Sequence, residues 1–260
     1  MGSHLLVQNE GGVATVTLNR PEVRNAMDDD TLRNLAETFE GFARQADLRA
    51  VVVRGAGKDF CAGADIQWMK RAGKSTAAQN RRDAELLVDM CAAVDECPVP
   101  VIARLHGAVF GGGLGLAAAC DVVIAEAGAR MCFSECRLGI LPAVVSSWVL
   151  PKIGETHARR LYLTGEVFGM EVAQRIGLVH EVAAEAELDA RVAAAVDGVL
   201  RNGPEAVRTA KRLIREFRTL SKPDRVRYSL DQLVKARASK EGQEGLAAFL
   251  EKRPASWIRK

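Results

Sequence analysis

The clearest candidate for acid–base chemistry in this chain is a carboxylate in an apolar setting. Glu135 lies within residues 131–142, where apolar side chains predominate. Burial of a carboxyl group raises its pKa toward the range in which it exchanges protons near neutral pH. The segment alone is equally compatible with an ion pair between Glu135 and Arg137 or another cation, so both interpretations stay open at this point.

Two glycine-rich turns are candidates for binding negative charge that develops on an oxygen. Residues 101–121 contain Gly111, Gly112 and Gly113 between a predicted strand and an alanine-rich helix, and residues 55–66 form a second turn of small residues after another strand. Unpaired N–H groups at a helix start lie at the positive end of the helix dipole, and glycine lets a ligand approach the backbone. Together the turns indicate an oxyanion hole, although a single run of three glycines is explained at least as well by tight packing.

Other side chains give weaker indications. His106 has no metal-like or triad spacing around it, which favours a hydrogen-bonded structural histidine. Ser134, Ser146 and Ser147 lack the G-x-S-x-G setting of a serine nucleophile. Neither glycine-rich turn matches the dinucleotide or P-loop patterns, so hydride transfer and nucleotide hydrolysis are not supported. No residues have the spacing of metal ligands, so we expect neither a metal nor a redox cofactor.

The elements that must position these residues alternate between strands and helices. The predicted strands are residues 5–7, 13–18, 51–53, 101–103 and 122–125, and helices are predicted from Asp28 and over residues 77–94. Gly11 and Gly12 indicate a hairpin between the first two strands. The apolar face of the first helix consists of Leu32, Leu35, Ala36, Phe39 and Phe42. This alternation predicts an α/β fold with largely parallel strand pairing.

After residue 182 the pattern becomes wholly helical. Helices are predicted over residues 188–200, 204–217, 225–238 and 241–250. We therefore expect an α/β core over residues 1–200 and a helical region over residues 201–260. Helices that cannot bury an apolar face alone should pack on the core or on another subunit.

Composition excludes several classes of protein. The chain has 260 residues, 48% of them hydrophobic, which is enough for a substantial core. No apolar run reaches the ~20 residues that span a bilayer, and no signal segment is visible, so we expect a cytoplasmic protein without membrane contact. The six cysteines form no C-x-x-C pair, which favours buried reduced thiols.

The net charge of +3 is mild, although bases are concentrated in the tail. They are Arg208, Lys211, Arg212, Arg215, Arg218, Lys222, Arg225 and Arg227. Acidic residues alternate with them on helical periods and no aromatic residues interleave, which indicates a solvated helix face and no nucleic-acid partner.

Several motifs, in this order, resemble the crotonase or enoyl-CoA hydratase/isomerase superfamily over nearly the whole chain. They are residues 19–26, residues 60–66, residues 106–121, Glu135 with residues 138–142, residues 163–165, residues 173–179 and residues 249–253. The resemblance implies a spiral of ββα units with a C-terminal all-helical trimerisation region. It also implies a homotrimer or a dimer of trimers that binds an acyl-CoA.

The resemblance further implies the residues of the site. The backbone N–H groups of Ala64 and Gly112 would hold the thioester oxygen, and Glu135 would move protons. The implied substrate-binding residues are Arg24, Ala26, Ala62, Asp65, Ile66, Gly111, Ala143, Phe249 and Lys252. The last two lie on terminal helices, which in the family often reach the CoA of a neighbouring subunit. Coenzyme A is part of the substrate, so no separate cofactor is implied.

One position departs from the family pattern. Typical hydratases of the family carry two glutamates around the substrate, whereas here the first position is Gly115 and the second is Glu135. A single carboxylate suits a double-bond isomerase. However, Gly115, Glu135, residues 142–144 and the ending 241–250 resemble a subgroup that hydrates branched glutaconyl-CoA thioesters in leucine or acyclic terpene breakdown. We expect such a hydratase first, an isomerase second, and a non-catalytic CoA-binding or RNA-associated protein third.

Overall fold

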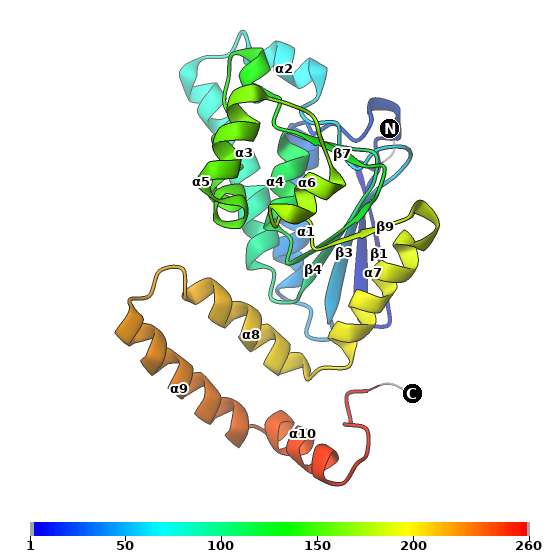
Figure 1. Ribbon diagram of the computed structural model, residues 1–260, viewed down its shortest axis with the longest axis vertical. Coiled ribbons are helices and arrows are strands. Elements are labelled where there is room, and N and C mark those ends of the chain that lie inside the picture. Colours follow the sequence, from blue (N-terminus) through cyan, green and yellow to red (C-terminus); the bar gives the residue numbers. More distant parts are fainter. Residues whose placement is uncertain (1–2, 259–260) are drawn as a thin grey trace.

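A six-stranded sheet runs through the main body of the computed structural model, which describes residues 3–258 (Figure 1). Its strands, in spatial order, are β1 (Leu5–Glu10), β2 (Val13–Leu18), β3 (Ala50–Gly55), β4 (Val101–Leu105), β6 (Val122–Glu126) and β9 (Glu181–Ala183). β1 and β2 pair antiparallel, and each later pair of neighbours is parallel. The predicted starting hairpin and the predicted parallel α/β arrangement are therefore confirmed.

Helix α1 (Asp29–Phe42) buries the face that its sequence period predicts. Asp28 caps the helix, because its carboxylate accepts a hydrogen bond from the N–H of Thr31 at 2.9 Å. The predicted apolar residues Leu32, Leu35, Ala36, Phe39 and Phe42 are all buried. Helix α3 (Ala77–Glu96) packs beside α1, so both cover the same side of the sheet (Figure 1).

A second sheet of three short strands is absent from the sequence-based expectations. Its strands are β5 (Ala108–Phe110), β7 (Arg130–Cys132) and β8 (Phe168–Gly169). Strands of two or three residues are too short to show the alternation by which a strand is recognised. β5 leads into the three-glycine turn and β7 leads toward Glu135, so this small sheet positions both parts of the candidate site.

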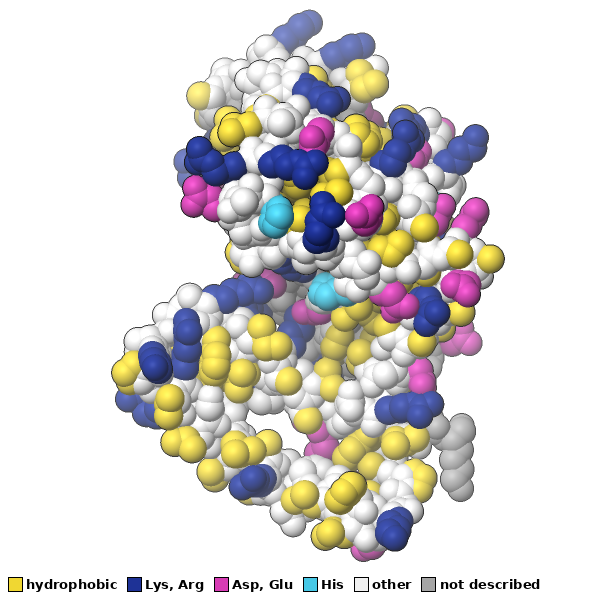
Figure 2. Space-filling model, viewed as in Figure 1, with side chains coloured by type: hydrophobic (Ala, Val, Ile, Leu, Met, Phe, Trp, Pro, Cys, Tyr) yellow, Lys and Arg dark blue, Asp and Glu magenta, His cyan; other side chains and the backbone are white. Residues whose placement is uncertain are grey.

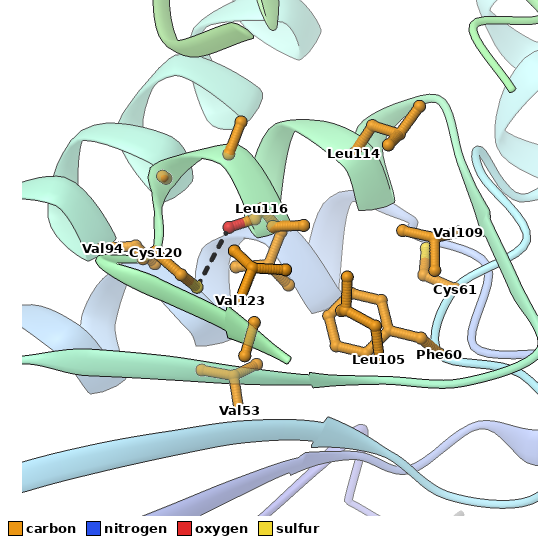
Figure 3. Close-up of a cluster of buried hydrophobic side chains, with 14 of the residues drawn as sticks. Val53, Phe60, Cys61, Val94, Leu105, Val109, Leu114, Leu116, Cys120 and Val123 are labelled. Carbon is orange, nitrogen blue, oxygen red and sulfur yellow. Dashed lines mark hydrogen bonds between the residues drawn. The ribbon is translucent and has the colours of Figure 1, made fainter. Parts of the chain in front are cut away.

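Helix α4 (Gly112–Ala119) is almost completely buried at the centre of the core. Figure 3 shows Leu114 and Leu116 of this helix among apolar side chains from the strands and from α3. A helix that is apolar on all sides belongs in a protein interior. Close packing around α4 therefore fixes the glycine turn at its N-terminus.

The remaining helices of the main body surround this core. They are α2 (Ile66–Ala72), α5 (Ser146–Thr164), α6 (Met170–Arg175) and α7 (Glu185–Leu200), with short 3-10 helices η1 (Pro21–Val23) and η2 (Glu135–Leu138). α7 covers the face of the sheet opposite α1 and α3 (Figure 1).

Three further helices extend away from the main body as an arm (Figure 1). They are α8 (Pro204–Glu216), α9 (Lys222–Ala238) and α10 (Lys240–Leu250), which confirms the predicted helical ending. The arm exposes the large apolar side chains Ile214, Val226, Leu230, Leu233, Val234, Leu246, Phe249 and Leu250. Figure 2 shows such side chains spread over the arm, and a cavity of about 600 Å³ opens between α8, α9 and α10.

Basic residues of α8 attach the arm to the main body. The Nζ atom of Lys211 lies 2.6 Å from Oδ2 of Asp121 and donates to the carbonyl of Val99. Arg208 donates to the carbonyl of Leu48 at 2.7 Å. Arg218 likewise pairs with Asp95 of α3. The interpretation of the basic tail as a solvated helix face is therefore wrong for Arg208, Lys211 and Arg218, because groups of the main body bind them.

The cysteines are free thiols, and all but one are buried. The buried ones are Cys61, Cys91, Cys97, Cys120 and Cys132, whereas Cys136 is exposed. Burial raises the pKa of Cys61 and of Cys120 to about 12. The prediction of buried reduced thiols is thus confirmed, except at Cys136.

Over residues 3–258, no helix is both long enough and apolar enough to cross a membrane. The same part of the chain holds no group of three or more His, Cys, Asp or Glu side chains placed to bind a metal ion.

Candidate active site

The two glycine-rich turns of the sequence meet at one place in the fold. Met27 forms a parallel bridge with Ala64, in which the N–H of Met27 donates to Gly63 and the N–H of Asp65 donates to Met27. A Cβ atom on Gly111 would lie 3.8 Å from Cα of Gly63. The turn after β3 therefore lies directly against the turn that begins α4.

Each turn offers a backbone N–H that donates to no other group among residues 3–258. In the parallel bridge with Met27, residues 63 and 65 make the hydrogen bonds, so the N–H of Ala64 points away from Met27. Gly112 is the first residue of α4, and the first N–H groups of a helix have no partner inside it. The arrangement suits an oxyanion, because a free N–H group of each turn and the positive end of α4 lie close together.

Glu135 lies beside this pair of turns. Its Oε1 would lie 3.5 Å from a Cβ atom added to Gly111. The backbone of Gly111 has a φ of +50° and a ψ of −118°, a conformation that suits glycine. The Oε2 of Glu135 is buried without a hydrogen-bond partner in the described part of the chain. The carboxylate therefore reaches the start of α4 and keeps one oxygen free for a ligand.

Burial raises the pKa of Glu135 above its ordinary value. The alternative that pairs this carboxylate with Arg137 is wrong, because the Arg137 side chain packs against Gly165 at the end of α5. A Cβ atom on Gly165 would lie 3.1 Å from Cγ and from Nε of Arg137. An unpaired carboxyl with a raised pKa is suited to accept and return a proton.

The position of the absent first glutamate is filled by a neighbouring side chain. A Cβ atom on Gly115 would lie only 2.5 Å from Cγ1 of Val145 and 3.3 Å from Sγ of Cys91. Val145 is itself buried. The bulkier segment after Pro142 thus occupies the space that a side chain at position 115 would need.

Two acidic residues, Asp28 and Asp65, hold the turn of residues 55–66 in place. One of them, Asp65, was predicted to bind substrate. Arg20 pairs with Asp28 and with Asp65, each at 3.0 Å. The Asp65 carboxylate also caps α2 by accepting from the N–H groups of Gln67 and Trp68. Because this side chain is buried and fully engaged, the predicted contact of Asp65 with CoA could come only from its backbone.

A second network fixes the other predicted CoA positions of this region. Arg24 donates through Nε to Asp59 at 2.7 Å, and Asp59 also accepts from the N–H of Ala108. The Arg24 guanidinium holds the pKa of Asp59 below its ordinary value. The N–H of Ala62 donates to the carbonyl of Arg24, and Ala26 is buried beside them. Arg24 and Ala26 therefore lie against the turn of residues 55–66, which contains Ala62.

The remaining predicted substrate residues fall into two groups. Ile66 is 69% exposed at the start of α2, and Ala143 is exposed in the segment after η2. Phe249 and Lys252 lie at the end of α10, at the opposite end of the molecule from α2 (Figure 1). Within one chain the structure does not bring these two residues to Glu135.

His106 is a structural histidine, as predicted. Its Nε2 lies 3.0 Å from the carbonyl oxygen of Gly57, and its Nδ1 lies 3.2 Å from Arg104. Both ring nitrogens are therefore engaged by other groups of the chain, one of them in the turn of residues 55–66.

Sequence reasoning missed the role of Val145 over Gly115 and the presence of Tyr162 near Glu135. Burial and, to a lesser extent, the negative charge of Glu135 raise the pKa of Tyr162, and the rings of Tyr162 and Phe133 are in edge contact. No sequence signal links Tyr162 to this region, because the contact depends on how α5 folds back.

The fold and the site define an α/β protein in which two free backbone N–H groups lie beside one buried carboxylate. The enoyl-CoA hydratase/isomerase family profile matches residues 8–260. A putative enoyl-CoA hydratase of Thermus thermophilus is 33% identical over 250 residues, which are 96% of this chain and 99% of that protein. A crotonyl-CoA hydratase of Syntrophomonas wolfei is 31% identical, over 99% of this chain and 98% of that protein.

The solved structure of Pseudomonas aeruginosa AtuE has a TM-score of 0.95 to this fold at 35% identity, covering 98% of this chain and 100% of that one. The chain belongs to the enoyl-CoA hydratase/isomerase family, and it is an enzyme of the hydratase-type lyase class. The family resemblance and the fold inferred from its motifs are thereby confirmed.

Proposed function

We propose that this enzyme adds water to the α,β double bond of a branched glutaconyl-CoA thioester, such as 3-methylglutaconyl-CoA or isohexenylglutaconyl-CoA. The observation that carries the hydration is the buried Oε2 of Glu135, which has no partner in the described chain, on a carboxylate that lies against the turn that begins α4. The branched acyl group is inferred from the sequence pattern of Gly115, Glu135 and residues 142–144.

The proposed reaction uses three groups of the chain. The N–H groups of Ala64 and Gly112 bind the thioester oxygen. Glu135 takes a proton from water while the water oxygen bonds to the β-carbon, and the electrons of the double bond move to the thioester oxygen to give an enolate. Glu135 then returns the proton to the α-carbon. Preorganised donors of this kind typically contribute about 10²–10³-fold in rate.

We also propose that the active unit is a homotrimer or a dimer of trimers. The arm exposes a large apolar surface, and Phe249 is 81% exposed. Since Phe249 and Lys252 lie far from Glu135 of their own chain, they would contact the CoA bound to a neighbouring copy.

Replacement of Glu135 tests the hydration. Glu135→Gln should lower kcat by about 10²–10⁴-fold, because the amide cannot accept a proton from water. The assay follows loss of the conjugated thioester absorbance with 3-methylglutaconyl-CoA and crotonyl-CoA, together with the product mass. Glu171→Gln, an exposed change on α6, is the matched control. Near-native turnover by both Glu135→Gln and Glu135→Ala would refute this mechanism.

The pH dependence gives a second test of the same group. Burial raises the pKa of Glu135 from 4.5, and the base works only when ionised. We therefore expect kcat to fall as the pH decreases through this raised pKa, by about tenfold per pH unit well below it. A kcat that stays constant down to about pH 4.5 would contradict the assignment of Glu135 as the base.

An isomerase is the second candidate, because the structure brings one carboxylate rather than two to the site, with Val145 against Gly115. A shifted double bond in a β,γ-unsaturated thioester, with no added water in any product, would establish this reaction in place of hydration.

A further inference from the structure

Helix α5 folds back on itself beside the candidate site. Gly154 breaks the helix with a φ of +70° and a ψ of +167°. In a straight helix, Ser146 and Tyr162 would be about 24 Å apart, because each residue adds about 1.5 Å. Here Oγ of Ser146 lies 3.1 Å from the hydroxyl of Tyr162. The break at Gly154 thus turns α5 into a hairpin that this polar pair closes.

The closed end of this hairpin lies at the region of Gly115 and Glu135. Ser146 follows Val145, the residue that packs against Gly115. The Tyr162 ring lies 4.7 Å, edge to face, from the ring of Phe133, which is two residues before Glu135. Burial, and to a lesser extent the negative charge on Glu135, raises the pKa of Tyr162, so its hydroxyl stays protonated near neutral pH.

Counting protons shows which atoms of the pair are free to bind a ligand. The Ser146 hydroxyl has one proton and donates it to the carbonyl of Pro142 at 2.5 Å. The contact with Tyr162 must then use the proton of the tyrosine. The Tyr162 oxygen consequently keeps its lone pairs as hydrogen-bond acceptors.

We propose that Tyr162, oriented by Ser146, holds the attacking water together with Glu135 and takes the place of the second carboxylate at position 115. The inference rests on the proposed hydration. One water hydrogen is donated to Glu135 and the other to the Tyr162 oxygen, so a lone pair of the water is left to attack the β-carbon. Tyr162 keeps its own proton throughout, and the proton transferred to the α-carbon comes from Glu135.

The test compares a reaction that consumes water with one that does not. Hydration of 3-methylglutaconyl-CoA needs the positioned water, whereas the double-bond shift of 3-hexenoyl-CoA needs Glu135 and the oxyanion hole alone. Tyr162→Phe should lower kcat for hydration by about 10²-fold, with KM and the rate of the double-bond shift changed by no more than about threefold. Tyr228→Phe, at the only other tyrosine of the chain, is the matched control and should change neither rate.

The outcomes separate this inference from the proposed function. If the wild-type enzyme hydrates its substrate and Tyr162→Phe hydrates it equally well, the role of Tyr162 is wrong while the hydratase stands. An equal loss of both reactions with a lowered thermal midpoint would also overturn it, because that pattern indicates a structural role. Absence of hydration by the wild-type enzyme would refute the proposed function itself.

If Tyr162→Phe does not fold, Ser146→Ala provides the same comparison. Without the serine, the tyrosine proton can turn toward the water in place of a lone pair. We expect a fall of about tenfold in the ratio of hydration to double-bond shift, and an unchanged ratio would overturn the proposal.

Discussion

At the scale of the single residue, the position of Glu135 suits reactivity but opposes stability. Its Oε2 is buried without a partner in the described chain, and burial raises its pKa. A carboxyl with a higher pKa in the folded than in the unfolded state holds its proton more tightly when folded. The folded state is therefore relatively destabilised once the pH rises above the ordinary pKa of the group.

Glu135→Gln should accordingly raise the thermal midpoint at about pH 8, because it removes an unpaired buried charge. The gain should disappear near about pH 4, where the wild-type carboxyl is protonated in both states. Thermal unfolding at the two pH values measures this, and Glu171→Gln should give no such pH-dependent gain. A variant less stable than the wild type at the higher pH would contradict the assignment of Glu135 as an unpaired buried charge.

The sequence was sufficient to single out Glu135 but not to decide its partner. Its apolar neighbours predict burial, yet Arg137 stands two residues away and an ion pair was equally plausible. Arg137 is instead held against Gly165, at the end of a helix that lies beside it only in the folded chain. Contacts between residues far apart in sequence decide such questions, and a local pattern does not contain them.

At the scale of the element, helix α4 and the segment before α5 are fitted to each other. Gly115 has no Cβ where Val145 lies, so the helix and the segment approach closely. Restoring a second glutamate at position 115 would therefore require a change at Val145 as well.

Gly115→Ala should lower the free energy of unfolding by about 1–2 kcal/mol, because overpacking outweighs the better helix propensity of alanine. In a Val145→Ala background the same change should become neutral or stabilising, since the clashing methyl group is gone. Urea denaturation of the two single variants and the double variant measures the coupling. Simple additivity of the two effects would show that Val145 can move aside in the folded protein.

Periodicity predicted most of the elements, and its failures have a common cause. The buried face of α1 and the strands of the large sheet other than β9 follow from patterns of apolar residues. The strands of the small sheet are too short to show a pattern, and the reversal of α5 depends on the backbone of Gly154. These are also the elements that bring Glu135 and Tyr162 to the site, so the site was less predictable than the fold.

At the scale of the whole molecule, the arm of α8, α9 and α10 presents apolar residues that the rest of its own chain leaves exposed. Leu246, Phe249 and Leu250 are each more than half exposed on α10. Exposed apolar patches of this kind mark association surfaces. The cations of α8 fix the arm to the main body, which gives this surface a defined orientation.

The double variant Phe249→Asp with Leu250→Asp should be monomeric, whereas the wild type should be a trimer or a multiple of one. Burying two carboxylates in an apolar interface without partners is strongly unfavourable. Light scattering after size-exclusion chromatography measures the mass. Lys240→Asp, an exposed change at the start of the same helix, is the control and should leave the assembly intact. A monomeric wild type would remove the basis for a contribution of Phe249 to the site of a neighbour.

The distribution of the thiols makes the protein convenient to label chemically. Reagents that attack thiolates should modify Cys136 in the folded protein, whereas the buried cysteines, with the pKa of Cys61 and of Cys120 raised to about 12, react only after unfolding. Cys136 follows Glu135 directly in the chain. A fluorophore placed there without any mutation would report on occupancy of the site, and the delayed reaction of the other thiols would time the opening of the core.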